Sequence, residues 1–170
     1  MKRFYIALLA FCSVMMFAGS CLANFDEPRG PGEHGIEVSE QPAIYYEAYI
    51  HDKGWTGRCV EMKAAGDPYG GQSLDAVRIY TDLNPYLDVV YRVHVANGEW
   101  SPWVANGATA GAPGHNIDGI EISFTGRAAM FFTVSYKVLS EGPSWENWTK
   151  SGETAGDLQH PLQSLRIKIE

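Results

Sequence analysis

Two tryptophans of this 170-residue chain are its strongest candidates for contact with a ligand. Trp103 and Trp148 stand 45 residues apart, and each is followed three residues later by a polar residue, Asn106 or Ser151. A partly exposed indole ring can stack on the apolar face of a sugar ring or anchor a protein interface. The expected chemistry is therefore binding through aromatic stacking, with Asn106 and Ser151 as polar neighbours.

The histidines and carboxylates of the chain show no catalytic or metal-binding pattern. His115 and His160 are also 45 residues apart, but neither has an obvious second ligand nearby, so solvated loop positions are expected for both. No carboxylate pair of the kind that a glycosidase needs recurs along the chain among the acids Asp67, Asp118, Glu121 and Asp157. Zinc-binding helix motifs, nucleophile elbows and phosphate loops are absent from the sequence. We therefore predict a protein that is not an enzyme and uses no metal or cofactor.

The two tryptophans belong to a larger pattern with the same step of 45 residues. Aligning the chain with itself at this step superposes three tyrosines, three tryptophans and three glycines: Tyr46, Tyr91, Tyr136, Trp55, Trp100, Trp145, Gly66, Gly111 and Gly156. Such a period indicates one supersecondary unit used three times, over residues of about 43–82, 88–126 and 132–170. We expect these nine residues to form the structural core of the repeats, with the large aromatic rings inside. The glycines are expected to supply turns or close backbone approaches.

Each repeat begins and ends with a segment in which apolar and polar residues alternate. In the second repeat Val89, Tyr91 and Val93 share one face, while Arg92 and His94 lie on the other, as in a half-buried strand. No segment has a convincing helical period, so the domain of residues 43–170 is predicted to be all-β. Three units are too few for a stable open solenoid, whereas a closed pseudo-threefold arrangement removes exposed strand edges. A β-prism-like fold is predicted, with a β-trefoil-like fold as the alternative.

The first 42 residues have the composition of a leader and an arm. Residues 1–23 combine Lys2 and Arg3 with an apolar stretch and small residues, which predicts a signal peptide. Residues 24–42 contain proline, glycine and acidic residues without periodicity, which indicates a linker or N-terminal arm. Cleavage after Ala23 would give a secreted protein. In the alternative, Cys21 lies in a lipobox-like sequence, and lipidation there would anchor the protein at the cell surface; only then is a membrane an expected partner.

Composition and charge indicate a globular domain and exclude one class of partner. Hydrophobic residues make up 45% of the chain and charged residues 19%, as in an ordinary globular domain. The formal net charge is −7. Binding to phosphates requires a basic surface, so nucleic acid is not an expected partner.

The second repeat resembles the clostridial hydrophobic-tryptophan repeat, often called ChW. The residues that carry the resemblance are Tyr91 to Val95, Trp100, Trp103 to Gly107, Ala110, Gly111 and Ile117 to Ile122. All three copies are similar to this family, which implies an extracellular bacterial protein that contacts cell surfaces, polysaccharides or other large molecules. The expected function is a non-enzymatic extracellular binding module for cell-surface or cell-wall polysaccharide. The alternative is a protein-contact or adhesion module, possibly self-associating, with a surface protein as partner.

The first repeat departs from the other two at three positions together. Arg58, Glu61 and Met62 stand where the second repeat has Trp103, Asn106 and Gly107. A joint replacement of this kind indicates that one feature is missing from the first repeat. Two equivalent binding sites are therefore predicted, one in each of the second and third repeats.

Overall fold

The structure is a computed structural model that describes residues 41–142 and 144–170. The predicted signal peptide, the lipidation alternative at Cys21 and the predicted arm as far as residue 40 lie outside the described residues. The described part contains twelve β-strands and no helix, which confirms the all-β prediction. It follows that no helix in the described ranges has the length and apolarity needed to span a membrane.

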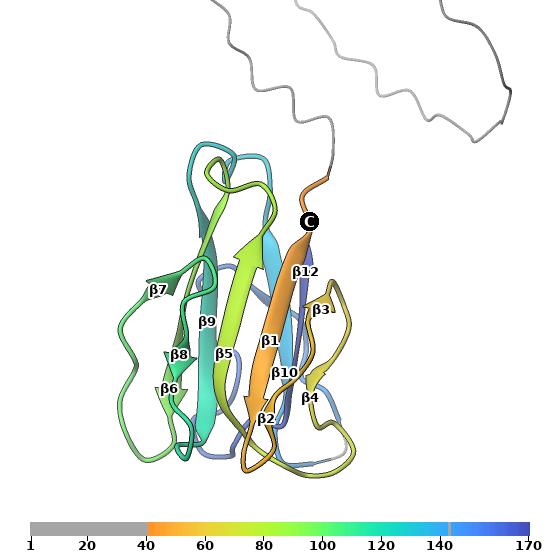
Figure 1. Cartoon of the computed structure of the whole chain (residues 1–170), viewed down its shortest axis with the longest axis vertical. Coiled ribbons are helices and arrows are strands. Elements are labelled where there is room, and N and C mark those ends of the chain that lie inside the picture. Colours follow the sequence, from red (N-terminus) through yellow and green to blue (C-terminus); the bar gives the residue numbers. More distant parts are fainter. Residues whose placement is uncertain (1–40, 143) are drawn as a thin grey trace, which may run out of the picture. The chain divides into compact units, whose positions relative to one another are not determined.

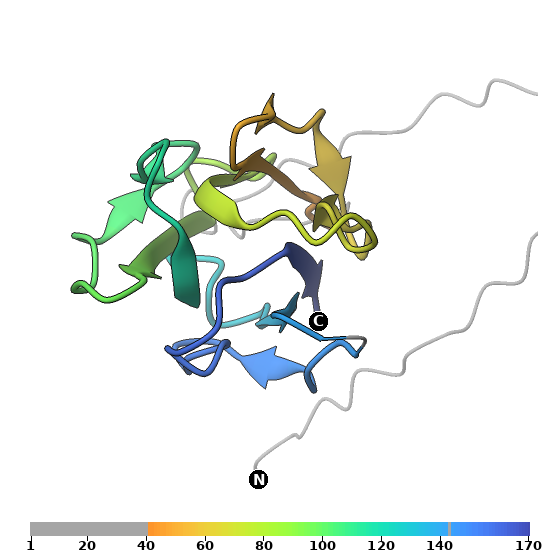
Figure 2. The ribbon, with the colours of Figure 1, turned by 90° about the horizontal axis from the view of Figure 1, so that it is seen from below.

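The strands form three antiparallel sheets, which Figure 2 shows grouped around a common centre. The first sheet contains β1 (Ile44–Ile50), β2 (Gly54–Trp55), β3 (Cys59–Val60), β5 (Leu74–Thr81) and, at its edge, β8 (Ala110–Gly111). The second sheet contains β6 (Asp88–Val95), β7 (Val104–Ala105) and β9 (Ile117–Thr125). The third sheet contains β10 (Val134–Leu139), β11 (Thr149–Lys150), β12 (Ser164–Ile169) and, at its edge, β4 (Ala65–Gly66). The long strands run side by side in Figure 1.

The three sheets share one pattern of pairing. Each has a long antiparallel pair, namely β1 with β5, β6 with β9, or β10 with β12. A short strand pairs with the opposite edge of the first long strand, at the position of its tyrosine: Cys59 faces Tyr46, Val104 faces Tyr91 and Thr149 faces Tyr136. This short strand immediately follows the segment that carries the tryptophans.

The core lies between the inner faces of the long strands. Alternate residues of each strand point inward because side chains alternate across a pleated sheet. The second repeat follows the sequence prediction, since Val89, Tyr91 and Val93 are fully buried while Arg92 and His94 are only half-buried. The predicted core tyrosines Tyr46, Tyr91 and Tyr136 are among the largest fully buried side chains of the domain.

Each core tyrosine connects its own sheet to a neighbouring sheet. The Tyr91 hydroxyl donates to the Ala108 carbonyl and accepts from the Ile79 N–H of the first sheet at 2.9 Å. Tyr136 donates to Glu153 and accepts from Ile122 of the second sheet, and Tyr46 donates to Lys63 and accepts from Ile167 of the third. Burial raises the pKa of all three tyrosines to about 12. The hydroxyls therefore stay neutral and satisfy backbone groups in the interior.

The three glycines of the 45-residue pattern lie where one sheet contacts the next. Gly111 pairs with Ala76 of β5, and a Cβ atom on it would lie 2.3 Å from the Asp75 carbonyl oxygen. A Cβ on Gly66 would meet the Gln163 carbonyl oxygen, and one on Gly156 the Asp118 carbonyl oxygen, also at 2.3 Å. Only glycine allows backbones to approach this closely, and all three positions also have a positive φ.

The contacts between sheets run in a cycle. Strand β8 lies in the chain between β7 and β9 of the second sheet, but it pairs with β5 of the first sheet. In the same way β4 lies between β3 and β5 of the first sheet, but it pairs with β12 of the third sheet. Ala155, which lies between β11 and β12 of the third sheet, forms a bridge to Ile120 of the second. No single sheet closes on itself. The number of repeats and the choice between prism and trefoil remain predictions.

Candidate ligand-binding surface

The outer faces of the sheets carry tryptophans in contact with cationic side chains. The outward residues of the long strands, such as Arg92 of β6 and Lys137 of β10, are half-buried. The tryptophan segments turn back over these residues, because the short strand after each of them pairs with the same long strand. Indole rings and cations are thus brought together on the side of each sheet that faces away from the core.

In the second sheet, Arg92 lies between two indole rings. Its guanidinium carbon is 4.7 Å from the Trp100 ring centroid and 4.8 Å from that of Trp103. The Arg92 Nε donates to Glu121 at 2.8 Å, and the other Glu121 oxygen accepts from the Thr154 hydroxyl at 2.8 Å. The arginine is therefore fixed by a carboxylate on one side and by cation–π contacts on the other. We call Arg92, Trp100, Trp103 and Glu121 the second-sheet cluster.

In the third sheet, three cations lie against two indole rings. The Lys137 nitrogen is 5.6 Å from the Trp145 ring centroid and 4.9 Å from that of Trp148. Arg166 approaches Trp145 to 4.3 Å, and Lys168 approaches Trp148 to 4.7 Å. We call Lys137, Trp145, Trp148, Arg166 and Lys168 the third-sheet cluster.

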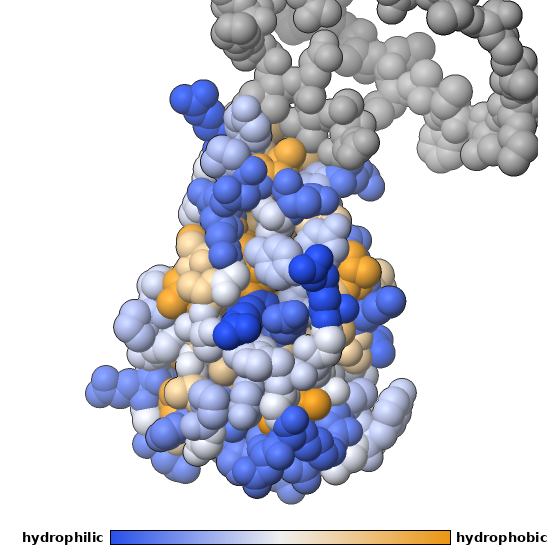
Figure 3. Space-filling model, in the orientation of Figure 1, coloured by the Kyte–Doolittle hydropathy of each residue, from blue (hydrophilic) through white to orange (hydrophobic). Residues whose placement is uncertain are grey.

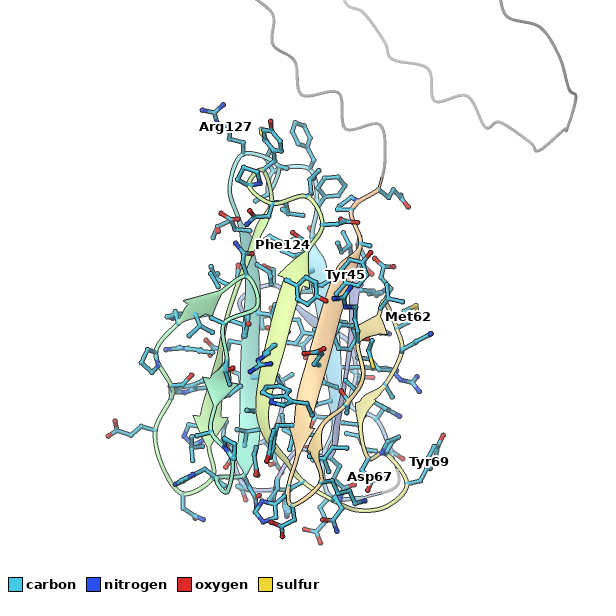
Figure 4. All side chains as sticks on the ribbon, in the orientation of Figure 1. Tyr45, Met62, Asp67, Tyr69, Phe124 and Arg127 are labelled. Carbon is cyan, nitrogen blue, oxygen red and sulfur yellow. The ribbon has the colours of Figure 1, made fainter. Side chains whose placement is uncertain are left out.

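The first sheet presents a different surface. Arg78 lies 4.0 Å from the Trp55 ring centroid, and no second tryptophan is present in this repeat. Arg58 lies over Tyr45 and Tyr80, whose rings stack with their centroids 5.4 Å apart. Tyr45 is labelled on this outer face in Figure 4. An arginine over two tyrosines thus occupies the place that Trp103 takes in the second sheet.

The prediction that Trp55, Trp100 and Trp145 lie in the core is wrong. All three are half-buried on the outer faces, and each ring is covered by at least one arginine. The buried tyrosines and aliphatic residues already fill the space between the sheets. Each indole ring gains a cation–π contact from the guanidinium, and its half-buried position leaves part of the ring at the boundary with solvent.

The two tryptophans predicted to bind differ in exposure. Trp103 is 46% exposed, whereas Trp148 is half-buried between Lys137 and Lys168. A groove of about 550 Å³ reaches the third-sheet cluster at Trp145. Tyr69, which is 97% exposed, lines the other side of this groove from the loop between β4 and β5. Figure 4 shows Tyr69 at the end of the domain opposite Arg127.

The predicted polar neighbours make hydrogen bonds within the domain. Asn106 accepts from the Val89 N–H at 3.0 Å and donates to Asp88 at 2.8 Å, which holds the turn before the second half of the repeat. The Ser151 hydroxyl lies 3.0 Å from that of Ser123 in the second sheet. Because both polar ends of Asn106 are occupied, this residue supports the backbone rather than offering atoms to a ligand.

Several histidines pair with carboxylates. Nδ1 of His94 lies 2.6 Å from the buried Asp118, and that of His51 lies 2.9 Å from the buried Asp75, whose hydrogen bond raises the pKa of His51. In the exposed loop His160 pairs with Asp157 and lowers the pKa of that carboxyl group to about 2. His115 is exposed, as predicted. Within residues 41–142 and 144–170, no three His, Cys, Asp or Glu side chains come together in a way that could hold a metal ion.

The cations of these clusters are functional candidates that sequence reasoning missed. The same step of 45 residues relates Glu47, Arg92 and Lys137, which is a reversal of charge at one repeat position. This signal was present in the sequence, but the contact between these residues and the tryptophans depends on how the loops fold back. Comparisons with known proteins add no further candidates, because the chain matches no protein-family model, no curated protein and no solved structure.

Proposed function

We propose that this protein is a non-enzymatic extracellular binding module that recognises cell-surface or cell-wall polysaccharide. The observation that carries the proposal is the outward placement of Trp103, which is 46% exposed and held against a fixed arginine. An indole fixed in this way offers one flat face for stacking on a sugar ring, with little loss of side-chain entropy on binding. The third-sheet cluster supplies a second surface with Trp148.

The same proposal covers the number of repeats and the closed arrangement of the three sheets. We infer that the three sheets are copies of one 45-residue unit in a closed, β-prism-like pseudo-threefold arrangement. The cyclic tyrosine, glycine and strand contacts support this inference. The resemblance to ChW repeats and a secreted location, or anchoring through Cys21, belong to the same proposal.

Two surfaces on one domain suit a polymeric ligand. Each shallow aromatic surface alone would bind a sugar weakly, but a polysaccharide chain can engage both. Binding at two linked sites can exceed either single affinity by about 10²-fold. This expectation favours ligands with repeated units over single sugars.

A glycan array and a cell-wall pulldown test the proposal. The parent domain is compared with Trp103→Ala, Trp148→Ala and the double variant, and folding of each is checked by its urea unfolding curve. Each single variant should bind more weakly than the parent, and the double variant should lose binding. Undiminished binding by a folded double variant would show that these indoles are not the sites.

One observation favours the alternative of a protein contact. Tyr86, Met130 and Phe131 are 46%, 80% and 64% exposed. Backbone hydrogen bonds join Tyr86 and Phe131 to Ala128, the neighbour of Arg127, which Figure 4 labels at one end of the domain. Elsewhere, on the face shown in Figure 3, hydrophobic residues are scattered among polar ones. Phe131→Ala is therefore the matched control: it should leave polysaccharide binding unchanged, whereas loss of self-association or of partner capture in this variant would favour the alternative.

A further inference from the structure

The third-sheet cluster differs from the equivalent positions of the other sheets in its charge. In the second sheet Arg92 faces Glu121 across the strand pair, and in the first sheet Glu47 faces Arg78. In the third sheet Lys137 faces Arg166. Like charges directly opposite each other on neighbouring strands destabilise a sheet. The other two positions place opposite charges across from each other, and in the second sheet Arg92 and Glu121 form an ion pair.

In the described part of the chain, this pair has no acidic partner within ion-pairing distance. Among the described residues the ion pairs involve neither Lys137 nor Arg166, and Lys168 alone in the cluster has an acidic partner, Glu170. The Nε atom of Arg166 is buried and has no hydrogen-bond acceptor. Cation–π contacts hold these side chains against Trp145 and Trp148 but provide no counter-charge.

The arrangement has the parts that an acidic sugar requires. Arg166 and Lys137 can donate several hydrogen bonds to a carboxylate or sulfate oxygen, and such charge-assisted bonds are stronger than neutral ones. The two indoles beside them are half-buried, and Trp145 lines the groove whose other side is formed by Tyr69. Figure 2 shows that the third sheet (blue) turns one face toward the other two sheets, which leaves its opposite face for a ligand.

We propose that the third-sheet cluster binds saccharides that carry carboxylate or sulfate groups, and that it gives the domain a preference for acidic over neutral polysaccharide. This inference rests on the proposed function and specifies its ligand. The chain as a whole has a formal net charge of −7 and therefore repels polyanions at long range. Selective binding of an acidic sugar must then come from the local cluster.

Pairs of ligands with the same sugar backbone but different charge test the proposal. Calorimetric affinities of the domain are measured for oligogalacturonate and for its methyl ester, and for dextran sulfate and dextran, at low and moderate salt. The acidic member of at least one pair should bind about tenfold more tightly or better, as expected for one added charge-assisted hydrogen bond. The preference should decrease as salt is added. The two pairs distinguish carboxylate from sulfate.

Three variants locate the preference. Lys137→Glu recreates the acid–arginine pair of the first sheet, so it should fold and should reduce the ratio of acidic to neutral affinity to about one, which is the loss of that same tenfold difference. Lys137→Gln removes the charge without adding one and should lower the ratio to an intermediate value. Arg78→Gln removes a cation beside a tryptophan in the first sheet, and is the control that should keep the ratio of the parent.

The outcomes separate this inference from the proposed function. Equal affinity of the parent for the acidic and neutral member of each pair would overturn the inference and leave polysaccharide binding intact. A preference that persists in folded Lys137→Glu would place the acidic site elsewhere and overturn it as well. Failure of the parent to bind any saccharide, neutral or acidic, would overturn both proposals.

Discussion

Replacing Gly111 by alanine is the most direct test of how the sheets are held together. Gly111 lies in β8, where a segment of the second repeat pairs with β5 of the first sheet. Its φ angle is +89°, and a Cβ atom would lie 2.3 Å from the Asp75 carbonyl oxygen and 2.9 Å from the Ala76 Cα. Both neighbours are backbone atoms of a central strand, so neither can move without disturbing the first sheet.

Two effects add in this variant. A side chain at positive φ costs about 1–2 kcal/mol. Forcing a methyl group into a packed contact costs about a further 1–3 kcal/mol, because the surrounding backbone must shift. Gly111→Ala should therefore lower the free energy of unfolding by about 2–5 kcal/mol, which is a large part of the stability of a typical domain.

Gly114→Ala is the matched control. Gly114 also has a positive φ, +84°, but no atom would lie within 4 Å of an added Cβ. This variant should lose only the conformational part, about 1–2 kcal/mol. Urea unfolding followed by tryptophan fluorescence gives both values under identical conditions.

The difference between the two variants isolates the contact between the sheets. If Gly111→Ala and Gly114→Ala are equally stable within about 0.5 kcal/mol, the usual spread for surface changes, the two backbones at Gly111 are farther apart than the 2.3 Å approach requires. Gly66→Ala and Gly156→Ala extend the test, since their added Cβ atoms would also meet carbonyl oxygens at 2.3 Å.

Three further predictions concern stability. Tyr91→Phe should cost about 1–3 kcal/mol in urea unfolding, because the Ile79 N–H and the Ala108 carbonyl lose their partner; a loss near zero would show that water replaces the hydroxyl. The folded-state pKa of this tyrosine and its two equivalents is about 12 against 10.0 for an unperturbed tyrosine, so their contribution is complete below pH 10 and is lost as the pH rises toward 12. Urea midpoints should fall across that range, and a constant midpoint would contradict the burial of the hydroxyls. Met62 has a φ of 58°, and its N–H donates to the Ile167 carbonyl as that of Gly107 donates to Ile79; Met62→Gly should therefore raise the stability by up to about 1 kcal/mol, whereas Met62→Ala, which keeps the strain, should not.

The long strands could be predicted from the sequence because their burial follows a period of two. The alternation around Tyr46, Tyr91 and Tyr136 gave both the inward face and its outward neighbours. The recurrence of the glycines gave the expectation of turns or close backbone approaches at these positions. Local periodicity and recurrence were sufficient for these features.

The positions of the tryptophans could not be predicted in the same way. Trp55, Trp100 and Trp145 lie in or beside strands only two residues long or in loops, where no period indicates the inner or outer side. Recurrence at a fixed step does not distinguish a position in the core from one on the outer surface. Their location depends on the cations of the long strands, which are distant in sequence and could be assigned only from the structure.

The cyclic contacts between the sheets determine when the domain can become stable during folding. The Tyr46 hydroxyl accepts its hydrogen bond from Ile167, 121 residues later, and the Ser164 side chain donates to Ala65, 99 residues earlier. Tyr46 and Ala65, which lie early in the chain, therefore cannot complete their hydrogen bonds until almost the last residue of the chain is available. Chains dominated by such distant pairings fold on the scale of milliseconds to seconds rather than microseconds. A chain that ends before β12 would lack the Ile167 N–H that donates to the Tyr46 hydroxyl, so folding should be a single late event rather than a stepwise growth from the N-terminal side.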